Sequence, residues 1–435
     1  MNTIWRFLTK FASIIVGPLH CFDRVIFKGC ASVKPVDEQL ALIGRGVEQI
    51  VPLEELKQKL ARSHAAGKPL RVKYGIDPTG IDVHLGHTVP LRKLRLFQEL
   101  GHQAVLIIGN YTALVGDPSG RDQTRASLTQ EQVEANAKDY LKQIAKIIDI
   151  TKTEVTHNGD WFKKFSFIDV IKLTGKITVQ RMIERDDFTK RIKAGTPIYL
   201  HECLYPLMQG WDSAEIKADI ELGGSEQLFS LMVARDLQKD QGQEPQICLT
   251  LPILRGLDGQ RRMGKSLGNY IGVAEPAYEQ FAKTMSIPDD LLREWYELLT
   301  DRPEGDYLPL IAREPMNAKK QLGRDIVAFY YGAAAALEAQ KEWEQRISGG
   351  GDPTDIPEVK VAATELTGGS MGIARLLVLV GIAKTNNEAR RAIDGGGVTI
   401  GPERTRITDP KALIAVTDGL VVRFGKRQVV KVKLA

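Results

Sequence analysis

A strand–helix–strand pattern between residues 70 and 109 constrains the fold of this chain more than any other feature. Residues 70–76 predict a strand, and residues 88–100 predict a helix whose apolar side is formed by Val89, Leu91, Leu94, Phe97 and Leu100. Gly101 supplies a helix stop, and residues 103–109 (QAVLIIG) are apolar throughout, as in strands buried within a parallel sheet. The segment therefore predicts a right-handed βαβ unit and an α/β fold.

The composition is that of a large globular protein. The 435 residues are 43% hydrophobic and 26% charged, with a mean hydropathy of −0.18, which suggests about three domains. These values exclude a disordered tail protein and a collagen-like repeat. No apolar run approaches the ~18 residues of a membrane span, so we expect no membrane association. The cysteines lack a C-x-x-C pattern, which argues against a disulfide scaffold or thiolate zinc site and fits a reducing, cytoplasmic setting; they are Cys21, Cys30, Cys203 and Cys248.

Later patterns divide the chain. Thr129 and Gln132 form a capping box that predicts a helix start, residues 246–254 predict a strand, and residues 275–346 have helical texture. The Gly/Pro/Asp-rich stretch 348–357 marks a boundary. Beyond it, residues 373–380 and 386–393 predict helices, and residues 398–400, 420–424 and 428–434 predict strands. We expect an α/β domain at 35–270, a helical domain at 271–347, a linker at 348–366 and a small α+β domain at 367–435.

The first 34 residues allow two interpretations. Five basic residues against the single Asp23, together with a short apolar run, are typical of a targeting peptide. There is no clear small-residue cleavage site, and Pro18, His20 and Asp23 would interrupt an amphipathic helix. An untargeted extension, or a start codon placed too early, is the alternative.

The positive charge is concentrated at the C-terminus. Residues 367–435 carry twelve Lys or Arg against five Asp or Glu, a surplus of +7, so residues 1–366 carry −2 of the total of +5. This asymmetry points to a polyanionic partner for the last domain.

The turn between the first strand and its helix is the first candidate site. It contains Asp77-Pro78-Thr79 and His84-x-Gly86-His87. Gly86 permits a close backbone approach of a phosphate at a helix N-terminus, and the two imidazoles can donate to phosphate oxygens as charge builds up. The alternative is a pair of surface histidines beside a turn glycine. Ligands of open α/β sheets bind at such turns, which raises the weight of the functional interpretation.

A basic loop about 175 residues further on is the second candidate site. It contains Arg262, Gly264, Lys265 and Ser266 after a Gly-rich segment at 256–259. Clustered cations on a glycine-bearing loop suit the pyrophosphate half of a triphosphate. An isolated run of this kind is otherwise an ordinary solvated loop.

A polar stripe defines a third feature. Tyr205, Gln209 and Asp212 are spaced i, i+4 and i+7, so one helix presents them on one face. The flanking Leu204, Leu207 and Met208 indicate a mostly buried helix, where unsatisfied polar groups are costly. The stripe therefore predicts a ligand pocket, with an ordinary solvated helix face as the alternative.

Taken together and in this order, these motifs resemble the His-Ile-Gly-His and Lys-Met-Ser-Lys-Ser sequences of class I aminoacyl-tRNA synthetases. From about residue 35 to the C-terminus the chain is similar to the bacterial-type tyrosyl-tRNA synthetases, and its tail resembles an S4 RNA-binding module. The remaining motifs of the resemblance are 75–79 (GIDPT), 116–120 (GDPSG), 223–227 (GGSEQ) and the 205–212 stripe. The resemblance implies a Rossmann-like, doubly wound parallel-sheet catalytic domain, a helical intermediate domain and a small S4-like α+β domain.

The resemblance also implies roles for individual residues. The catalytic group comprises His84, His87, Arg262, Lys265 and Ser266. ATP is bound by Gly75, Asp77, Thr79, His84, Gly86, His87, Glu226 and Lys265, with Glu226 near the ribose. Asp117, Tyr205 and Gln209 hold the ammonium of the amino acid, Gln227 lies near its carboxylate, and Asp212 accepts a hydrogen bond from the phenol. In the tail, tRNA would meet Arg375, Lys384, Arg390 and Arg391.

The chain departs from the common family pattern at four positions. Lys73 stands where many members carry a tyrosine that contacts the phenol hydroxyl, so Asp212 must carry more of the discrimination. Arg262 and Gly264 replace Lys and Ser, and the guanidinium keeps the charge in a planar form. Glu226 replaces the usual Asp with a longer carboxylate.

The expected activity is therefore the ATP-dependent charging of tRNA(Tyr) with L-tyrosine. We expect magnesium only as the counterion of ATP, no metal site of the protein, no prosthetic group, and a homodimer by family resemblance. A tryptophan-charging relative is one alternative, against which the 205–212 stripe and the basic tail argue. A catalytically inactive RNA-binding protein is the other, against which His84, His87 and Lys265 argue.

Overall fold

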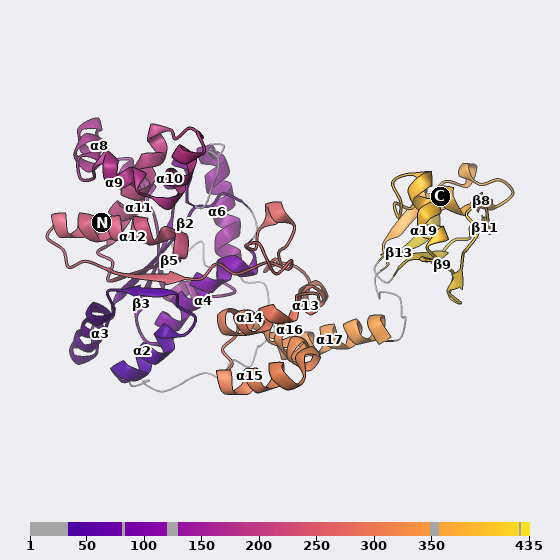
Figure 1. The fold of residues 1–435 in the computed structure, drawn as a ribbon, viewed down its shortest axis with the longest axis horizontal. Helices are drawn as coiled ribbons and strands as arrows, with labels where there is room; N and C mark the ends of the chain where they lie inside the picture. The colour runs from indigo at the N-terminus through magenta and orange to yellow at the C-terminus, as the bar shows by residue number, and fades with distance from the viewer. Residues whose placement is uncertain (1–33, 81–82, 120–128, 349–355, 426–427) are drawn as a thin grey trace, which may run out of the picture.

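The computed structural model describes residues 34–80, 83–119, 129–348, 356–425 and 428–435 (Figure 1). Residues 1–33 of the expected N-terminal extension and residues 349–355 of the expected linker lie outside this range. Gly120, the last residue of one family motif, does so as well. None of the described helices is long and apolar enough to cross a membrane.

A mixed sheet forms the centre of the larger part of the protein. Within the described residues its strand order is β1-β6-β5-β2-β3-β4. The strands are β1 (Gln49–Val51), β2 (Arg71–Ile76), β3 (Gln103–Ile108), β4 (Thr153–His157), β5 (Ile220–Gly224) and β6 (Ile247–Leu251). All neighbours pair in parallel except β1, which is antiparallel to β6. The chain winds from β2 to β4 on one side and returns to β5 and β6 on the other, which confirms the doubly wound α/β fold.

Helices cover the sheet. The longer ones are α2 (Val36–Gly44), α3 (Leu53–Ala66), α4 (Leu85–Glu99), α6 (Gln130–Ile144), α11 (Leu204–Ile216) and α12 (Leu228–Asp240). The capping box expected at Thr129 and Gln132 opens α6, and Gly101 follows α4 with the positive φ of 89° that a helix stop requires. The predicted helix at 88–100 begins three residues earlier, at Leu85, because His84 serves as its N-cap. Short helices occupy the β4–α11 segment: α7 (Gly159–Phe162), α8 (Phe167–Thr174), α9 (Val179–Ile183) and α10 (Asp186–Lys193).

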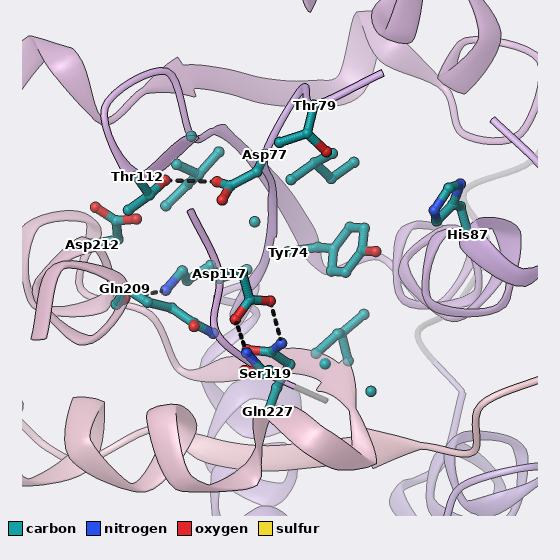
Figure 2. Close-up of a pocket in the computed structure, with 18 of the residues that line it drawn as sticks. Tyr74, Asp77, Thr79, His87, Thr112, Asp117, Ser119, Gln209, Asp212 and Gln227 are labelled. Atoms are coloured by element: carbon teal, nitrogen blue, oxygen red, sulfur yellow. Dashed lines mark hydrogen bonds between the residues drawn. The ribbon is translucent and has the colours of Figure 1, made fainter. Parts of the chain in front are cut away.

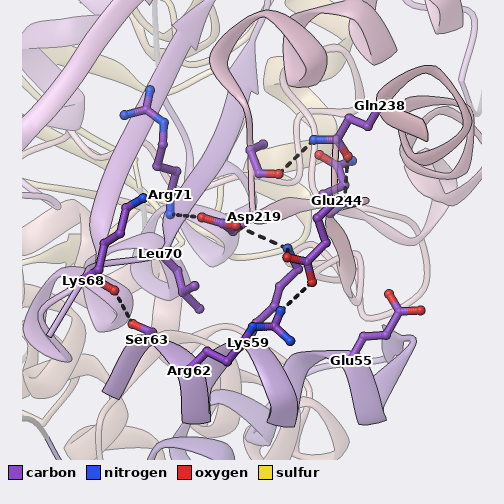
Figure 3. A network of polar contacts seen from close by, with 12 residues as sticks. Glu55, Lys59, Arg62, Ser63, Lys68, Leu70, Arg71, Asp219, Gln238 and Glu244 are labelled. Carbon is purple, nitrogen blue, oxygen red and sulfur yellow. Dashed lines mark hydrogen bonds and ion pairs between the residues drawn. The ribbon is translucent and has the colours of Figure 1, made fainter. Parts of the chain in front are cut away.

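A polar network ties α3 to the amino ends of the central strands (Figure 3). The buried Lys59 ammonium lies 3.2 Å from Asp219 Oδ1, and Asp219 Oδ2 accepts a 2.9 Å hydrogen bond from the Arg71 amide. Arg62 pairs with Glu244 at 2.5 Å. These contacts fix the starts of β2 and β5, and the opposite, carboxyl ends are free to build a site.

The helical region follows the sheet in sequence but shares its core. It comprises α13 (Ala277–Met285), α14 (Leu292–Leu299), α15 (Glu304–Arg313), α16 (Pro315–Tyr331) and α17 (Ala333–Ser348). Trp295, Tyr296 and Leu322 are buried in the same hydrophobic cluster as Leu94 of α4 and Leu106 of β3. Residues 275–346 are therefore mainly helical, as the sequence predicts. Two of their helices, α14 and α16, pack into the core beneath the sheet.

A second sheet forms the C-terminal domain. Its strand order is β10-β9-β12-β13-β7, built from β7 (Glu358–Val361), β9 (Val398–Ile400), β10 (Thr405–Arg406), β12 (Val421–Phe424) and β13 (Gln428–Leu434). Two helices, α18 (Ile373–Leu379) and α19 (Asn386–Asp394), pack on it around a separate core that includes Ile373, Leu376 and Val422.

One sequence expectation about this domain needs correction. Residues 358–366 were expected to belong to the linker, but β7 pairs in parallel with β13, with Val359 opposite Val432. Its partner lies some 70 residues away in sequence, and a short strand without a local hairpin turn gives little periodic signal. The sheet domain therefore begins at Glu358.

Candidate active site

A cavity of about 300 Å³ opens at the carboxyl ends of β2, β3 and β5, where the winding of the sheet reverses. This is the position at which open α/β sheets bind ligands, and its volume is at the lower end for small-molecule pockets. The cavity brings together eleven of the predicted site residues. Figure 2 labels several of them, among them Asp77, Asp117 and Asp212. They are Gly75, Asp77, Thr79, His87, Asp117, Tyr205, Gln209, Asp212, Glu226, Gln227 and Arg262.

One wall of the cavity is formed by Asp77, which directly follows β2, and by the residues that donate hydrogen bonds to it. The Tyr205 hydroxyl donates to Asp77 Oδ2 at 2.9 Å, and the Thr112 hydroxyl donates to Oδ1 at 2.7 Å. Gly109 lies against this carboxylate so closely that an added Cβ would be 2.1 Å from Asp77 Oδ1. Asp77, expected on the ATP side, is thus bonded to a residue expected to bind the amino acid.

A second carboxylate faces the same space from the loop after β3. Asp117 Oδ2 accepts from Gln227 Nε2 at 2.9 Å, and Asp117 Oδ1 accepts from the Ser119 amide at 2.8 Å (Figure 2). The Gln227 oxygen is buried and has no hydrogen-bond partner among the described residues. Two carboxylates and an unsatisfied amide oxygen make this part of the pocket suited to a cationic group such as an ammonium.

The predicted helix with the polar stripe is α11. Of the three residues in the stripe, Asp212 is the most buried, with 4% of its surface exposed. Asp212 Oδ1 accepts from Trp161 Nε1 at 3.0 Å, and Oδ2 accepts from Asn158 Nδ2 at 3.2 Å. Burial raises the pKa of Asp212 to about 7, against the opposing effect of the nearby Lys73 ammonium. The carboxylate has lone pairs left for one more donor, such as a hydroxyl.

Sequence reasoning missed Asn158 and Trp161. Asn158 is fully buried directly after β4, and its amide also donates to Thr112 at 3.0 Å. In the sequence, Asn158 is marked only by its position at the carboxyl end of a strand and close to a tryptophan. This position indicates a site residue only once β4 is known to lie next to β3.

The raised pKa of Asp212 predicts a pH dependence of ligand binding. Above about pH 7 the carboxylate is ionised and accepts a hydroxyl; as the pH falls through 7 it takes up a proton and must lose that proton to act as the acceptor. We therefore expect tyrosine to bind about tenfold more weakly at pH 6 than at pH 8. Isothermal calorimetry across this range would measure the effect.

Two controls accompany this pH profile. Phenylalanine has no hydroxyl, so its much weaker affinity should stay flat over the same range, and the Asp212→Asn protein should show a flat profile for tyrosine. A flat tyrosine profile in the unaltered protein would contradict the assignment of Asp212 as the acceptor.

The two histidines stack at the N-terminus of α4. Their ring centroids are 3.7 Å apart, and the His84 amide donates to His87 Nδ1 at 3.4 Å. Burial lowers the pKa of His84 to about 2 and that of His87 to about 4, and the charge of Lys265 contributes to both shifts. Both imidazoles are therefore neutral near pH 7 and offer an N–H donor rather than a fixed charge. An added Cβ at Gly86 would lie 3.1 Å from the His84 ring, which explains the glycine.

The basic loop reaches the same end of the sheet. Arg262 lines the cavity, and the buried Met263 next to it would contact a Cβ at Gly86 at 3.5 Å. Lys265 begins a short 3-10 turn (Lys265–Leu267), and its charge acts on both histidines. The two motifs thus lie together. His84, Gly86, Lys265 and Ser266 do not line the cavity itself, but His84, Gly86 and Lys265 border His87 beside it.

Glu226 lines the cavity just after β5. Burial raises its pKa, with the positive charge of Arg262 acting in the opposite direction. Among the described residues, no group of three or more His, Cys, Asp or Glu side chains could hold a metal ion.

The predicted tail residues lie on the two helices of the C-terminal domain or next to them. Arg375 is on α18, Lys384 precedes α19, and Arg390 and Arg391 are on α19. All four are exposed, and Arg375 forms an ion pair with Glu365. All four are remote in sequence from the residues that line the cavity.

A doubly wound sheet with a carboxylate-rich pocket, a His-x-Gly-His turn and a basic loop defines an α/β enzyme that activates a small substrate with a nucleotide. Comparison with known proteins narrows the class. The family model described as "tRNA synthetases class I (W and Y)" matches residues 65–348. The chain belongs to this family.

Relatives and solved structures agree with this membership. A Tyrosine--tRNA ligase of Symbiobacterium thermophilum is 50% identical over 92% of this chain and 98% of its own length. One from Geobacter sulfurreducens is 46% identical over 92% of this chain and all of its own length. The crystal structure of a tyrosyl-tRNA synthetase from Archaeoglobus fulgidus in complex with L-tyrosine has the same fold, with a TM-score of 0.57, 24% identity, and coverage of 71% of this chain and 100% of that one.

Proposed function

We propose that this protein is a tyrosine–tRNA ligase, which activates tyrosine with ATP and transfers it to the 3′ end of tRNA(Tyr). The observation that carries this proposal is Asp212, a buried carboxylate held by two donors with room to accept a third from a phenol hydroxyl. The full-length relatives named Tyrosine--tRNA ligase support it, and the tryptophan alternative is not favoured.

The reaction needs no covalent enzyme intermediate. The tyrosine carboxylate attacks the α-phosphorus of ATP and displaces pyrophosphate; a terminal ribose hydroxyl of the tRNA then attacks the mixed anhydride. Asp117, Tyr205 and Gln209 would hold the ammonium, while neutral His84 and His87 would donate to phosphate oxygens.

The remaining residues of the proposed mechanism contact the pyrophosphate and the nucleotide. Arg262, Lys265 and Ser266 would neutralise the departing pyrophosphate, and Gly75, Thr79 and Glu226 would bind the nucleotide. The resemblance implies Gln227 near the substrate carboxylate, but its Nε2 is bonded to Asp117, and its oxygen, unbonded among the described residues, favours the ammonium instead. Magnesium would enter only as the counterion of ATP.

The direct test of this function is ATP–pyrophosphate exchange with tyrosine, tryptophan and phenylalanine as separate substrates. Exchange with tyrosine alone is expected. Exchange driven by tryptophan would identify the other member of the family, and absence of exchange with all three would identify a protein without synthetase activity.

We further propose that the C-terminal domain is the S4-like module that binds tRNA and takes no part in the first chemical step. The surplus of +7 over residues 367–435 and the exposed arginines there support contacts to several phosphates, whose strength should fall steeply with salt. A protein ending at residue 355 would lose the whole second sheet, since that sheet begins at Glu358. It should retain tyrosine-dependent exchange and lose most tRNA charging. Full charging efficiency, or loss of exchange in a folded protein, would contradict this role.

Assembly is proposed to be homodimeric, through the segment between β4 and α11. Large apolar side chains are exposed there, including Phe167 at 80%, Val179 at 77% and Leu200 at 83%. A surface of this kind is typical of a protein–protein interface. Because the family resemblance implies a homodimer, we propose a second copy of this chain as its partner. Phe167→Asp should convert the dimer to a monomer in analytical ultracentrifugation. Exposed Leu413→Asp in the C-terminal domain is the matched control and should leave the dimer intact.

We place the protein in the cytoplasm as part of the same proposal. The four cysteines are widely spaced, and Cys203 and Cys248 are free thiols. Both features fit a reducing compartment.

A further inference from the structure

A buried ion pair at the wall of the cavity is not explained by the proposed chemistry; its Lys73 lines the cavity, and its Glu221 does not. Lys73 of β2 and Glu221 of β5 are directly opposite each other in the parallel register. Their side chains are 0% and 1% exposed, and Lys73 Nζ lies 2.8 Å from Glu221 Oε1. Removing two charges from water is costly, so such a pair needs further hydrogen bonds to be tolerated.

The Lys73 ammonium has no hydrogen left for a ligand. It donates to Glu221 Oε1 at 2.8 Å, to the Gln209 carbonyl at 2.8 Å and to the Ser213 hydroxyl at 2.7 Å. An ammonium carries three N–H donors, and three acceptors occupy them. Lys73 therefore does not take over the phenol contact of the tyrosine that many family members carry at this position.

Glu221 in turn fixes the amide of Gln209. Glu221 Oε1 accepts from Gln209 Nε2 at 3.3 Å, and Oε2 accepts from the Ser213 hydroxyl at 2.9 Å. The side-chain nitrogen of Gln209 is therefore engaged by Glu221. The Gln209 oxygen is then left buried at the cavity, with no hydrogen-bond partner among the described residues. An unsatisfied buried acceptor calls for a donor from the ligand.

We propose that the Lys73–Glu221 pair positions Gln209. Lys73 holds its backbone carbonyl and Glu221 holds its side-chain nitrogen, so that the side-chain oxygen receives the ammonium of the bound amino acid. The inference rests on the proposed function and adds to it a role at the ammonium end of the pocket, distinct from the phenol end at Asp212. Lys73 and Glu221 act through Gln209: protein acceptors engage all three N–H donors of Lys73, and Glu221 does not line the cavity.

A matched pair of double variants tests the proposed contact. Lys73→Met with Glu221→Gln removes both charges and keeps an acceptor for Gln209 Nε2. Lys73→Met with Glu221→Leu removes both charges and that acceptor, together with the oxygen that accepts from the Ser213 hydroxyl and Gln246 Nε2. A ligand without the ammonium therefore serves as the control for these additional losses. Neither leaves a buried charge unpaired, and both change the electrostatics at Asp212 equally.

Calorimetry with two ligands gives the readout. The Leu variant should bind tyrosine about tenfold more weakly than the Gln variant, the size of one lost hydrogen bond to a charged group. 3-(4-Hydroxyphenyl)propanoate lacks the ammonium, so it should bind the two variants equally. Tyr/Phe discrimination in exchange kinetics should also be the same in both variants.

Other results would overturn the proposal. Equal tyrosine affinities in the two variants would show that the acceptor at 221 does not position Gln209. Equal losses for both ligands would show a general collapse of the pocket. If the Leu variant does not fold, Glu221→Met in the same background replaces it; failure of both to fold would show that the pair serves folding instead.

The inference can fail separately from the proposed function. An unaltered protein that neither binds tyrosine nor supports tyrosine-dependent exchange would overturn the function. An active, tyrosine-binding protein whose two variants behave alike would overturn the inference alone.

Discussion

Replacing Asp212 by asparagine should remove most of the discrimination between tyrosine and phenylalanine. Asparagine keeps the size but has one acceptor oxygen, while Trp161 Nε1 and Asn158 Nδ2 both point at this side chain as donors. Its Nδ2 would therefore face another donor, and its oxygen would be occupied before a phenol arrives. Sites built to bond a hydroxyl reject the analogue that lacks it by about 10⁴–10⁵, a magnitude established for tyrosine-charging enzymes.

The measurement is kcat/KM for both amino acids in pyrophosphate exchange. Glu215→Gln is the matched control, because Glu215 is an exposed carboxylate one turn further along α11. It should leave the ratio unchanged. An unchanged ratio in the Asp212→Asn protein would show that another group selects the phenol.

The second large effect is expected from Lys265→Ala. Lys265 lies near His84 and His87 but does not line the cavity, so its proposed partner is the departing pyrophosphate rather than the amino acid. Loss of a charge contact made mainly in the transition state should lower the rate of adenylate formation by about 10²–10³, by analogy with the removal of one oxyanion donor. The affinity for tyrosine should change little.

Single-turnover kinetics and tyrosine binding would separate these two quantities. Arg261→Ala is the control on the same loop, because the exposed Arg261 is paired with Asp258 at 2.9 Å. It should retain the rate within a few-fold. If Lys265→Ala lost tyrosine affinity and kept its single-turnover rate, the loop would have a role in amino-acid binding instead.

Local patterns were sufficient for much of the fold. The helix stop at Gly101, the capping box at Thr129 and the apolar strand at 103–109 each depend on neighbouring residues. The structure has all three, with the strand ending one residue earlier, at Ile108. The same holds for the stripe of Tyr205, Gln209 and Asp212, since helical geometry alone places them on one face. The α/β class and the family follow from features of this kind.

Contacts between distant segments could not be predicted in the same way. The pairing of β7 with β13 moved the start of the C-terminal domain from the expected 367 to Glu358. The burial of α14 and α16 against the sheet likewise depends on side chains separated by some 200 residues in the sequence. Neither feature leaves a periodic pattern, because each is decided by which surfaces meet in space.

The sequence by itself determined which residue types stand at the turn after β2, on α11 and in the basic loop, and therefore the class of chemistry. Only the tertiary structure decided their partners. Asn158 and Trp161, which follow β4, became hydrogen-bond donors to Asp212 of α11. Lys73 became the partner of Glu221 because β2 and β5 pair in parallel with these two residues in register. Burial raises the pKa of Asp212, and no local sequence pattern records that burial. The three acceptors around Lys73 likewise come from β5 and α11, and together they engage all of its N–H donors.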